Sequence, residues 1–354
     1  DTEAVLLAGN NASGVYPIKY YRGKFDVYQR TYVIRSLDES KLTNRFLYYA
    51  LQPKLELLQR ISTGAATKFL TMTILKNLDL DLPPLMIQQR IVATLSAYDD
   101  LIEINLRRIK ILEEMAQAIY REWFVHFRFP GHEKVKIVDS PLGKIPGSWS
   151  VRAIADVCLK INSGGTPLRK INQYWEDGEV NWFKTKELAD TFLFESEEKI
   201  SARGVKESAA KIFPRGTVVM AIYAAPTVGR LGVLTKDSTF NQAAIGLLPD
   251  PRQMSEIFLF YALLSLRSYF NSISLGAAQQ NISKEKLVAA QFVLPHSDLV
   301  QRFDKEIRPI WNQIEILLRT NRNLPQTRDL LLPRLISGEL SPNGLDISEE
   351  NAVT

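Results

Sequence analysis

The sequence predicts an α+β protein in which two mixed α/β domains are separated by two long helices that pair as an antiparallel coiled coil. Three observations predict this fold. The chain repeats itself at a fixed offset, each copy ends in a helix with a 3.5-residue apolar period, and the segments before those helices are short apolar runs broken by turn formers. With 354 residues, 45% of them hydrophobic, the chain is long enough for two or three domains with ordinary cores.

The repeat has an offset of 212 residues, because position 258 matches position 46 (258 − 46 = 212). The run FLYYAL at 46–51 aligns with FLFYAL at 258–263, and ISTGAA at 61–66 aligns with ISLGAA at 273–278. The register then holds through the next helix, where the matches are Leu82-Pro83 with Leu294-Pro295, Gln89-Arg90 with Gln301-Arg302, and Ile102-Glu103-Ile104 with Ile314-Glu315-Ile316. Identities clustered in both loop and helix at one offset indicate a structural repeat.

A seam of every third or fourth residue runs through each long helix. In the first helix it consists of Ile91, Leu95, Tyr98, Ile102, Asn105, Ile109, Leu112, Ala116, Ile119 and Trp123, and in the second of Phe303, Ile307, Ile310, Ile314, Leu317, Asn321, Leu324, Arg328, Leu331 and Leu335. This period is a coiled-coil signature, and pseudo-twofold symmetry makes the pair antiparallel. Asn105 is then expected to face Asn321 and to fix the register. Pro309, Pro325 and Pro333 are each expected to bend or break the second helix.

The segment 141–295 is typical of a mixed α/β domain with many short elements. We expect strands at 180–183, 216–223 and 231–234, and a helix at 255–271. Among these elements, SGGTP at 163–167 is expected either to bring its backbone close to a phosphate or to form a simple turn.

Charge placement favours a nucleic-acid partner without establishing it. Lys and Arg outnumber Asp and Glu by 11 to 8 over residues 1–82 and by 18 to 14 over 141–295, so these segments carry +3 and +4 while the whole chain carries +5. The single Cys158 cannot form an intrachain disulfide and is expected to be a small buried hydrophobe, and the three histidines have no metal-ligand spacing. The sequence has neither a membrane-length apolar stretch nor a secretory signal, so we expect a cytoplasmic protein.

Several short motifs follow one another in a recognisable order. They are IYREWF at 119–124, LGKIPGSW at 142–149, SGGTP at 163–167, YW at 174–175, VNW at 180–182, FNQA at 240–243 and the stretch 276–283. Together with the repeat, they closely resemble the specificity subunit of type I restriction-modification systems. The resemblance covers about residues 3–340.

This resemblance implies a non-catalytic subunit in which two target recognition domains each read one half of a bipartite DNA site. It implies double-stranded DNA, two methyltransferase subunits and two restriction subunits as partners, and no membrane. S-adenosylmethionine, ATP and Mg are then expected in those partner subunits, with no cofactor in this chain. The expected organisation is the C-terminal part of a first recognition domain at 1–82, a long helix at 83–127, a linker at 128–150, a second recognition domain at 151–295, a second long helix at 296–338 and a tail at 339–354.

Base readout needs Arg, Lys, Asn or Gln on loops that reach base edges, whereas phosphate contacts only position the protein. The candidates in the second domain are Lys184, Lys186, Tyr223, Thr227, Arg230, Gln242, Gln279, Gln280 and Asn281. Those in the first are Asn10, Asn11, Arg22, Gln29, Arg30, Thr67 and Lys68. Because Thr67-Lys68 replace Gln279-Gln280 in the repeat, the two domains should read different sequences. Each candidate also has a plainer interpretation as a solvated loop residue.

Two apparent catalytic motifs are better explained in other ways. Asp81-Leu82-Pro83-Pro84 resembles the acidic-Pro-Pro-aromatic loop of adenine methyltransferases, but a Leu interrupts it and no aromatic residue follows. Asp177 with Glu197 and Lys199 imitates a nuclease pattern within an acidic surface run. The chain has no G-x4-GK[ST] loop, so any use of ATP belongs to another chain.

A second hypothesis is a coiled-coil adaptor, or a partial specificity subunit with one working DNA-reading head. The second domain has about 75 residues before the point where the first copy begins to match it. The chain also starts at Asp1 and not at Met, so the first domain is expected to begin in mid-domain. Strands left in such a domain would have unpaired edges.

Overall fold

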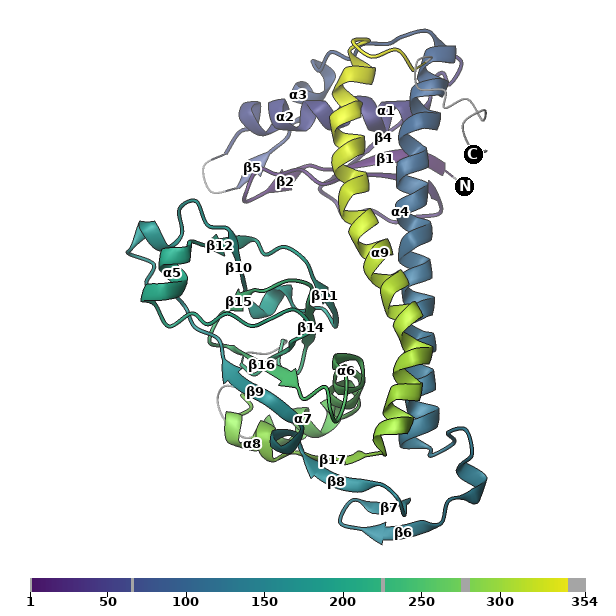
Figure 1. The fold of residues 1–354 in the computed structure, drawn as a ribbon. Helices are drawn as coiled ribbons and strands as arrows, with labels where there is room; N and C mark the ends of the chain where they lie inside the picture. Colours follow the sequence, from purple (N-terminus) through teal and green to yellow (C-terminus); the bar gives the residue numbers. More distant parts are fainter. Residues whose placement is uncertain (1, 65–66, 224–226, 275–280, 343–354) are drawn as a thin grey trace, which may run out of the picture. The chain divides into compact units, whose positions relative to one another are not determined.

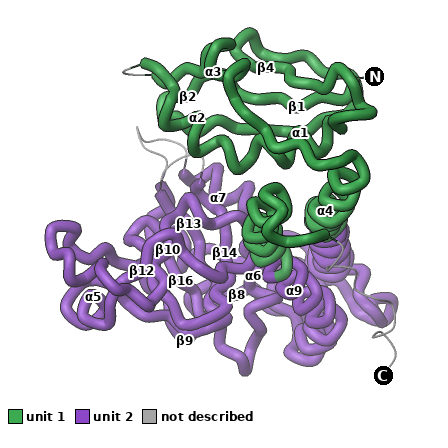
Figure 2. Tube along the Cα trace, turned by 90° about the horizontal axis from the view of Figure 1, so that it is seen from above, with its two compact units in different colours: residues 1–107, 320–354 green, residues 108–319 purple. Residues whose placement is uncertain are grey.

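The computed structural model describes residues 2–64, 67–223, 227–274 and 281–342. These residues divide into two compact units (Figure 2). Unit 1 comprises Asp1–Arg107 and Thr320–Thr354, and unit 2 comprises Arg108–Arg319. We call residues 2–82 of unit 1 the first head and residues 151–295 of unit 2 the second head. Each unit also contains a section of both long helices.

The first head is a three-stranded antiparallel sheet, in the order β3-β1-β4, packed against short helices (Figure 1). Its elements are β1 (Thr2–Ala8), β2 (Asn10–Asn11), β3 (Ile18–Gly23), β4 (Thr31–Ile34), α1 (Asn44–Leu51), a 3-10 turn (Gln52–Lys54), α2 (Leu55–Ile61), β5 (Lys68–Phe69) and α3 (Met72–Lys76). The Thr43 side chain caps α1 by accepting a hydrogen bond from the Phe46 backbone N–H. Val5 and Leu7 of β1 are buried and form the centre of this head.

The second head is larger, with a five-stranded sheet in the order β11-β14-β13-β16-β9 and a three-stranded sheet in the order β12-β10-β15. Its strands are β8 (Ser150–Ala153), β9 (Cys158–Ser163), β10 (Val180–Phe183), β11 (Thr191–Leu193), β12 (Glu198–Ile200), β13 (Val218–Ala221), β14 (Leu231–Leu234), β15 (Thr239–Phe240), β16 (Ala244–Pro249) and β17 (Gln291–Leu294). Its helices are α5 (Ala202–Glu207), α6 (Glu256–Ser265), α7 (Arg267–Ser274) and α8 (Lys284–Ala289), with 3-10 turns at Ile154–Val157, Asn172–Tyr174 and Thr185–Glu187. Before it, a 3-10 turn (His132–Lys134) and the hairpin β6 (Ile137–Ser140) to β7 (Gly143–Pro146) follow the first long helix.

The repeat is visible element by element. The antiparallel trio β3-β1-β4 of the first head has the same order and the same repeat positions as β14-β13-β16 of the second. In the second head β11 pairs with the outer edge of β14, and β9 pairs with the outer edge of β16. In the described part of the first head no strand pairs with the outer edge of β3 or β4. Strands β9 and β11 come from residues 158–193, which at the 212-residue offset align with positions before residue 1 of the given sequence.

The long helices are α4 (Leu85–Tyr120), which continues as a π turn (Arg121–Val125), and α9 (Ser297–Ile336). None of the twenty seam positions is exposed. In unit 1, Ile91 and Leu95 of α4 share a core with Leu332 and Leu335 of α9. Farther along α4 in the same unit, Asp99 pairs with Arg328, which lies earlier in α9. In unit 2, Ile109 of α4 shares a core with Ile314 and Leu317 of α9, and Tyr120, farther along α4, contacts the ring of Phe303, which lies earlier in α9. The helices are therefore antiparallel in each unit.

The break that the prolines predicted does not occur, because α9 is continuous from Ser297 to Ile336. Pro309 and Pro333 lie on its exposed side. The carbonyl groups that lose an N–H partner four residues earlier therefore face water, which lowers the cost of a proline inside a helix. The buried seam holds the helix together on its other side.

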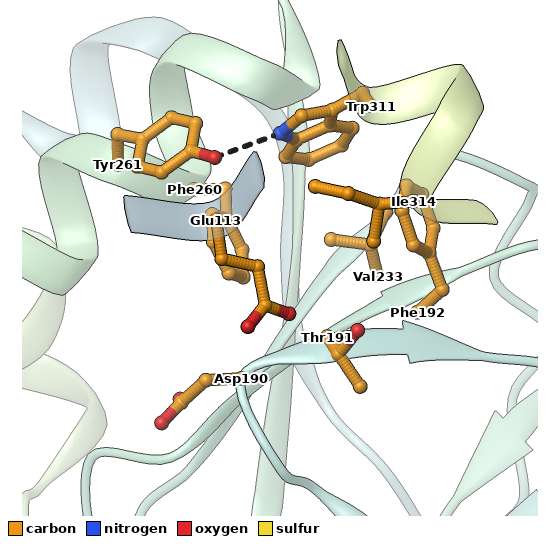
Figure 3. A pocket seen from close by; sticks show the side chains of 9 residues that line it. All are labelled: Glu113, Asp190, Thr191, Phe192, Val233, Phe260, Tyr261, Trp311 and Ile314. Atoms are coloured by element: carbon orange, nitrogen blue, oxygen red, sulfur yellow. Dashed lines mark hydrogen bonds between the residues drawn. The ribbon is translucent and has the colours of Figure 1, made fainter. Parts of the chain in front are cut away.

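Each head docks on its section of the long helices through a tyrosine at an equivalent repeat position. In unit 1, the Tyr49 hydroxyl donates to Oδ2 of Asp99 at 2.5 Å, and Arg328 forms an ion pair with the same carboxylate. In unit 2, the indole N–H of Trp311 donates to the Tyr261 hydroxyl at 3.0 Å (Figure 3). Asp99 and Trp311 are equivalent positions (311 − 212 = 99), so one junction is ionic and the other aromatic.

The structure confirms some of the strands and helices expected in the second head and changes the bounds of others. The strands expected at 180–183 and 231–234 are β10 and β14, and the one expected at 216–223 is shortened to β13. The helix expected at 255–271 is two helices, because the chain turns at Leu266 between α6 and α7. Cys158 is partly buried, and burial raises the pKa of its thiol to about 12, which keeps it protonated and unreactive. No helix in the described ranges is long and apolar enough to cross a membrane.

Candidate nucleic-acid interface

Four of the candidate residues in the second head meet at the connection between β13 and β14. Tyr223 forms an isolated antiparallel bridge with Asn281, and both are exposed. The Thr227 hydroxyl donates to the Tyr223 carbonyl at 3.2 Å, and the Arg230 backbone N–H donates to the Thr227 carbonyl at 2.9 Å. An aromatic, an amide and a guanidinium group are thus held on one small backbone framework, which is the side-chain chemistry that base-edge contacts require.

A clamp that the sequence did not reveal fixes the base of this connection. Asp190 has a positive φ of 59° and accepts from the Leu231 backbone N–H at 2.8 Å. The guanidinium of Arg267, on α7, forms an ion pair with Asp190 and donates from Nε to the Gly229 carbonyl at 3.1 Å. Two segments distant in sequence, at Asp190 and at Arg267, are therefore tied to the start of β14. Asp190 and Arg267 lie 77 positions apart with no periodic signal between them, so sequence reasoning had no means of pairing them.

Gln242 follows β15 and lies at the same edge, because the carbonyl of the next residue, Ala243, accepts from the Ile222 backbone N–H at 2.9 Å. The Gln242 side chain is exposed, and its Oε1 accepts a hydrogen bond from the Thr166 hydroxyl. Thr166 belongs to the glycine-rich loop, so the loop orients the amide. An oriented amide is better prepared to bind one base edge than a freely rotating one.

The glycines of that loop approach protein backbone. A Cβ on Gly164 would lie 2.1 Å from the Phe240 carbonyl oxygen, and a Cβ on Gly165 would lie 2.1 Å from the Ala209 carbonyl oxygen. Both distances are far below van der Waals contact, so only glycine fits at either position. Close backbone packing within the head therefore accounts for the SGGTP motif.

Lys184 and Lys186 follow β10 and are held by acidic residues. Nζ of Lys184 lies 3.2 Å from carboxylate oxygens of both Glu197 and Glu198, and Nζ of Lys186 lies 2.7 Å from Glu197. Partial desolvation opposes the charge of Lys184, but the hydrogen bonds to the two glutamates prevail and raise its pKa. The Lys186–Glu197 pair is 59% and 52% exposed, and ion pairs this exposed are weak.

These lysines adjoin the edge that carries Gln242. Strands β10 and β15 are parallel, Phe183 pairs with Phe240, and the Asn241 backbone N–H donates to the Phe183 carbonyl at 2.9 Å. Lys184 and Gln242 therefore leave neighbouring strand ends. Cationic groups and an exposed amide thus share this edge, and proteins use such groups for phosphate and base-edge contacts respectively.

In the first head, the candidates gather around the short pair β2–β5. Asn10 pairs with Phe69 and Asn11 with Lys68, and the guanidinium of Arg30 lies 5.6 Å from the centre of the Phe69 ring. The Arg30 carbonyl accepts from the backbone N–H of Gly9, the residue just before β2, at 2.8 Å. Gln29 and Thr67 are the sequence neighbours of these residues.

Two first-head candidates fit a base contact less well. Arg22 pairs with Glu3 at one end of β1, whereas Thr31, next to Arg30, pairs with Ala8 at the other end, so the two arginines are separated by most of the strand. Oδ1 of Asn11 accepts from the backbone N–H and the hydroxyl of Ser13 at 3.0 and 2.9 Å, which uses this oxygen to close the local turn.

Of the remaining candidates, Gln279 and Gln280 lie outside the described residues. Two members of the nuclease-like pattern are in ion pairs with other residues: Glu197 pairs with Lys184 and Lys186, and Lys199 pairs with Glu195. Over the ranges that the structure describes, no three His, Cys, Asp or Glu side chains gather in a way that could hold a metal ion.

Known proteins with similar sequence and structure bear on this interface. A model of the type I restriction modification DNA specificity domain matches residues 3–114 and 146–326. The MjaIX specificity subunit of Methanocaldococcus jannaschii is 26% identical over 84% of this chain and 69% of its own length, and the HindI specificity subunit of Haemophilus influenzae is 24% identical over 77% and 71%. The crystal structure of a type I restriction-modification S subunit from M. genitalium has the same fold, with a TM-score of 0.60 at 15% identity, over 94% of this chain and 82% of its own. The chain belongs to the type I restriction modification DNA specificity family.

Proposed function

We propose that the two heads read the two halves of a bipartite DNA site. The second head would read through Tyr223, Arg230, Gln242 and Asn281, with Lys184 and Lys186 on phosphates. The first head would read through the group around β2 and β5, with Arg30 as its main contact. The long helices would set the length of the DNA between the half-sites, which is not read.

One observation carries this proposal: equivalent positions of the two heads bear different side chains of base-reading type. Arg30 and Gln242 are equivalent (242 − 212 = 30), and both are exposed next to the strand that follows. Arginine prefers the O6 and N7 acceptors of guanine, whereas glutamine prefers the N7 acceptor and N6 donor of adenine. Two copies of one backbone framework that carry different side chains at an equivalent position suit two half-sites of different sequence.

The partners follow from the same proposal. The relatives are specificity subunits of type I restriction enzymes. We propose that this chain likewise assembles with methyltransferase and restriction subunits, two of each, in the cytoplasm where the chromosome lies. S-adenosylmethionine, ATP and Mg would then be bound by those subunits. The chain's own task is to choose the sequence at which they act.

Mapping methylated adenines tests the proposal in cells that carry this chain with its methyltransferase. The expected result is one split motif, with two specified halves and an unspecified gap. Arg30→Ala should relax one half of that motif and Gln242→Ala the other, because a well-placed bidentate contact is worth about 1–3 kcal/mol of discrimination.

Arg22→Ala is the matched control. It removes another exposed arginine of the first head, which lies on β3 opposite the far end of β1. It should leave the motif intact. A motif that changes in both halves with either variant would contradict separate reading by two heads. If the cells gain no newly methylated adenines, the result would favour a coiled-coil adaptor.

A further inference from the structure

In unit 1, the seam between α4 and α9 has a polar contact at Asn105 and Asn321 and another at Asp99 and Arg328. Nδ2 of Asn105 donates to Oδ1 of Asn321 at 2.9 Å, and Nδ2 of Asn321 donates to the Ile102 carbonyl at 3.1 Å. Asn105 is only 2% exposed, so its amide has little access to water. Each asparagine therefore depends on the other helix for its hydrogen bonds.

The second polar contact is the ion pair between Asp99 and Arg328. Its side chains are only 26% and 17% exposed, and Tyr49 adds a hydrogen bond to the same carboxylate. Burial and this hydrogen bond raise the pKa of Tyr49, which keeps its hydroxyl a donor. An aspartate at this depth needs a cation opposite it, because an unpaired charge is poorly solvated there.

The repeat shows what each of these residues would face if a helix paired with a copy of itself. Position 321 is equivalent to position 109 and position 328 to position 116, so in an α4·α4 pair Asn105 would face Ile109 and Asp99 would face Ala116. In an α9·α9 pair Asn321 would face Leu317. Arg328 would face Trp311, the equivalent of Asp99. Every polar group of the seam would lose its partner.

The apolar residues that these polar groups would face are buried against apolar partners in the observed pairing. In unit 2, Ile109 and Leu317 are 5% and 6% exposed and lie in one core. Ala116 and Trp311 are 0% and 5% exposed and lie in another. The small alanine on one helix is thus combined with the large tryptophan on the other. Polar meets polar and small meets large only when one helix of each kind is present.

We infer that α4 and α9 form a matched pair that accepts a helix of the other kind and rejects a second copy of itself. The partner that fits the seam of α4 is therefore an α9-type helix, from this chain or from another. Any assembly built from this chain, or from its two halves, then combines one first head with one second head. This inference concerns helix pairing alone and does not rest on the proposed DNA reading.

Single substitutions in the full chain reproduce the two rejected arrangements. Asn321→Ile makes Asn105 face an isoleucine, as in an α4·α4 pair, and Asn105→Leu makes Asn321 face a leucine, as in an α9·α9 pair. Each should reduce the folding equilibrium constant of the full chain by roughly tenfold, the typical effect of a buried polar group that loses its partner. The double variant Asn105→Leu/Asn321→Ile should recover to within about threefold, because no polar group is then left unmatched.

The exposed ion pair between Glu103 and Arg107 on the same part of α4 provides the control. Glu103→Ala/Arg107→Ala should leave the equilibrium constant almost unchanged. If the two asparagine variants are as stable as this control, mismatched helices carry no penalty and the inference is wrong.

A cut chain tests partner choice directly. A protease site is inserted in the exposed turn at Pro141-Leu142, and the full chain is folded and then cut. Two such preparations, with different tags on the first half, are mixed, unfolded and refolded together. First halves should be recovered with second halves at least about tenfold more often than with other first halves. Pairing in random proportion would overturn the inference.

Asp99→Ala/Asn105→Leu in the first half provides the converse, since an α4·α4 pair would then leave neither position 99 nor position 105 with an unmatched polar group. Pairs of first halves should become roughly tenfold more frequent than in the wild type. No increase would contradict the inference even if the wild-type halves pair as expected. If the halves do not re-pair after refolding, the variants of the uncut chain decide the matter.

Discussion

Tyr49 in the first head and Tyr261 in the second occupy the same position of the repeat, yet their hydroxyls do opposite things. Tyr49 donates its hydrogen bond to Asp99, which also binds Arg328, whereas Tyr261 accepts one from Trp311. One junction is thus an ionic triad and the other an aromatic core. The comparison teaches that the repeat preserves where a head meets its helices and leaves the chemistry of the contact free to diverge.

The aromatic junction should give the largest effect when it is broken. Trp311 is 5% exposed and packs edge-on against Phe192 and Phe260 as well as Tyr261. Trp311→Ala should lower the free energy of unfolding by about 3–5 kcal/mol, since it removes a large buried side chain and leaves a cavity. Denaturant melts of the full chain, with hydrogen exchange of the α6 amides, measure this. Ile316→Ala, at a 57% exposed position of the same helix, should cost little.

The ionic junction should give a smaller effect that depends on salt. Asp99→Ala removes the group that both Tyr49 and Arg328 bind, and it should cost about 1–3 kcal/mol in unfolding free energy. High salt should reduce this cost, whereas it should leave the cost of Trp311→Ala unchanged. Asp100→Ala is the control, because its ion pair with Arg45 is 60% exposed on the aspartate side. Equal salt dependence at the two junctions would show that the first is not ionic in character.

The phosphate contacts proposed for the second head should show in DNA binding. Lys184→Ala/Lys186→Ala should weaken binding equally for all sequences and reduce the slope of log affinity against log salt by about 0.9 for each phosphate that a lysine no longer neutralises. Lys199→Ala/Lys236→Ala removes two lysines that pair with Glu195 instead, and we expect no such change. A shift in sequence preference with the first variant would mean that these lysines contact bases.

The smallest expected effect lies beside the aromatic junction, where Glu113 of α4 lines a small pocket with Asp190 and Tyr261 (Figure 3). Burial, and then the negative charge of Asp190, raises the pKa of the Glu113 carboxyl. A carboxyl whose folded pKa is raised binds its proton more tightly in the folded state, so its ionisation lowers stability as pH rises through that pKa. Glu113→Gln should therefore raise the Tm slightly at mildly alkaline pH.

The same variant should have no advantage well below the usual titration range of glutamate, where Glu113 is protonated in both states. Glu114→Gln, at the next and exposed position, supplies the control. A Tm difference independent of pH would show that the effect comes from packing and not from charge.

The parts of the fold that could be predicted from the sequence are those marked by a periodic pattern of residues. The seams predicted helices at 83–127 and 296–338, and the structure has α4 at Leu85–Tyr120, extended by its π turn to Val125, and α9 at Ser297–Ile336. The repeat predicted the paired architecture, which the fold of the M. genitalium S subunit shares. Both signals are local, because a seam or a repeat is visible without knowing any distant contact.

What could not be predicted depends on contacts between distant segments. The break at Leu266 leaves no mark in the apolar run FLFYALLSL at 258–266. The glycines of the SGGTP loop were interpreted as a turn or a phosphate contact because their true neighbours, Phe240 and Ala209, are far away in sequence. The individual base-reading residues stay predictions for the same reason, since loop geometry decides which side chain reaches a base.

The clamp of Asp190 and Arg267 has a practical consequence for exchanging specificities. Under the proposed DNA reading, a new target would be sought by grafting the connection between β13 and β14 from a relative. Arg267 holds this connection at the Gly229 carbonyl from α7, and Asp190 holds it at the Leu231 N–H from the start of β11. Both anchors hold backbone atoms, so a graft of the connection alone keeps them as long as the receiving chain has Asp190 and Arg267. A recombination break point between residues 190 and 267 would keep the clamp only where each parent supplies its residue of this ion pair.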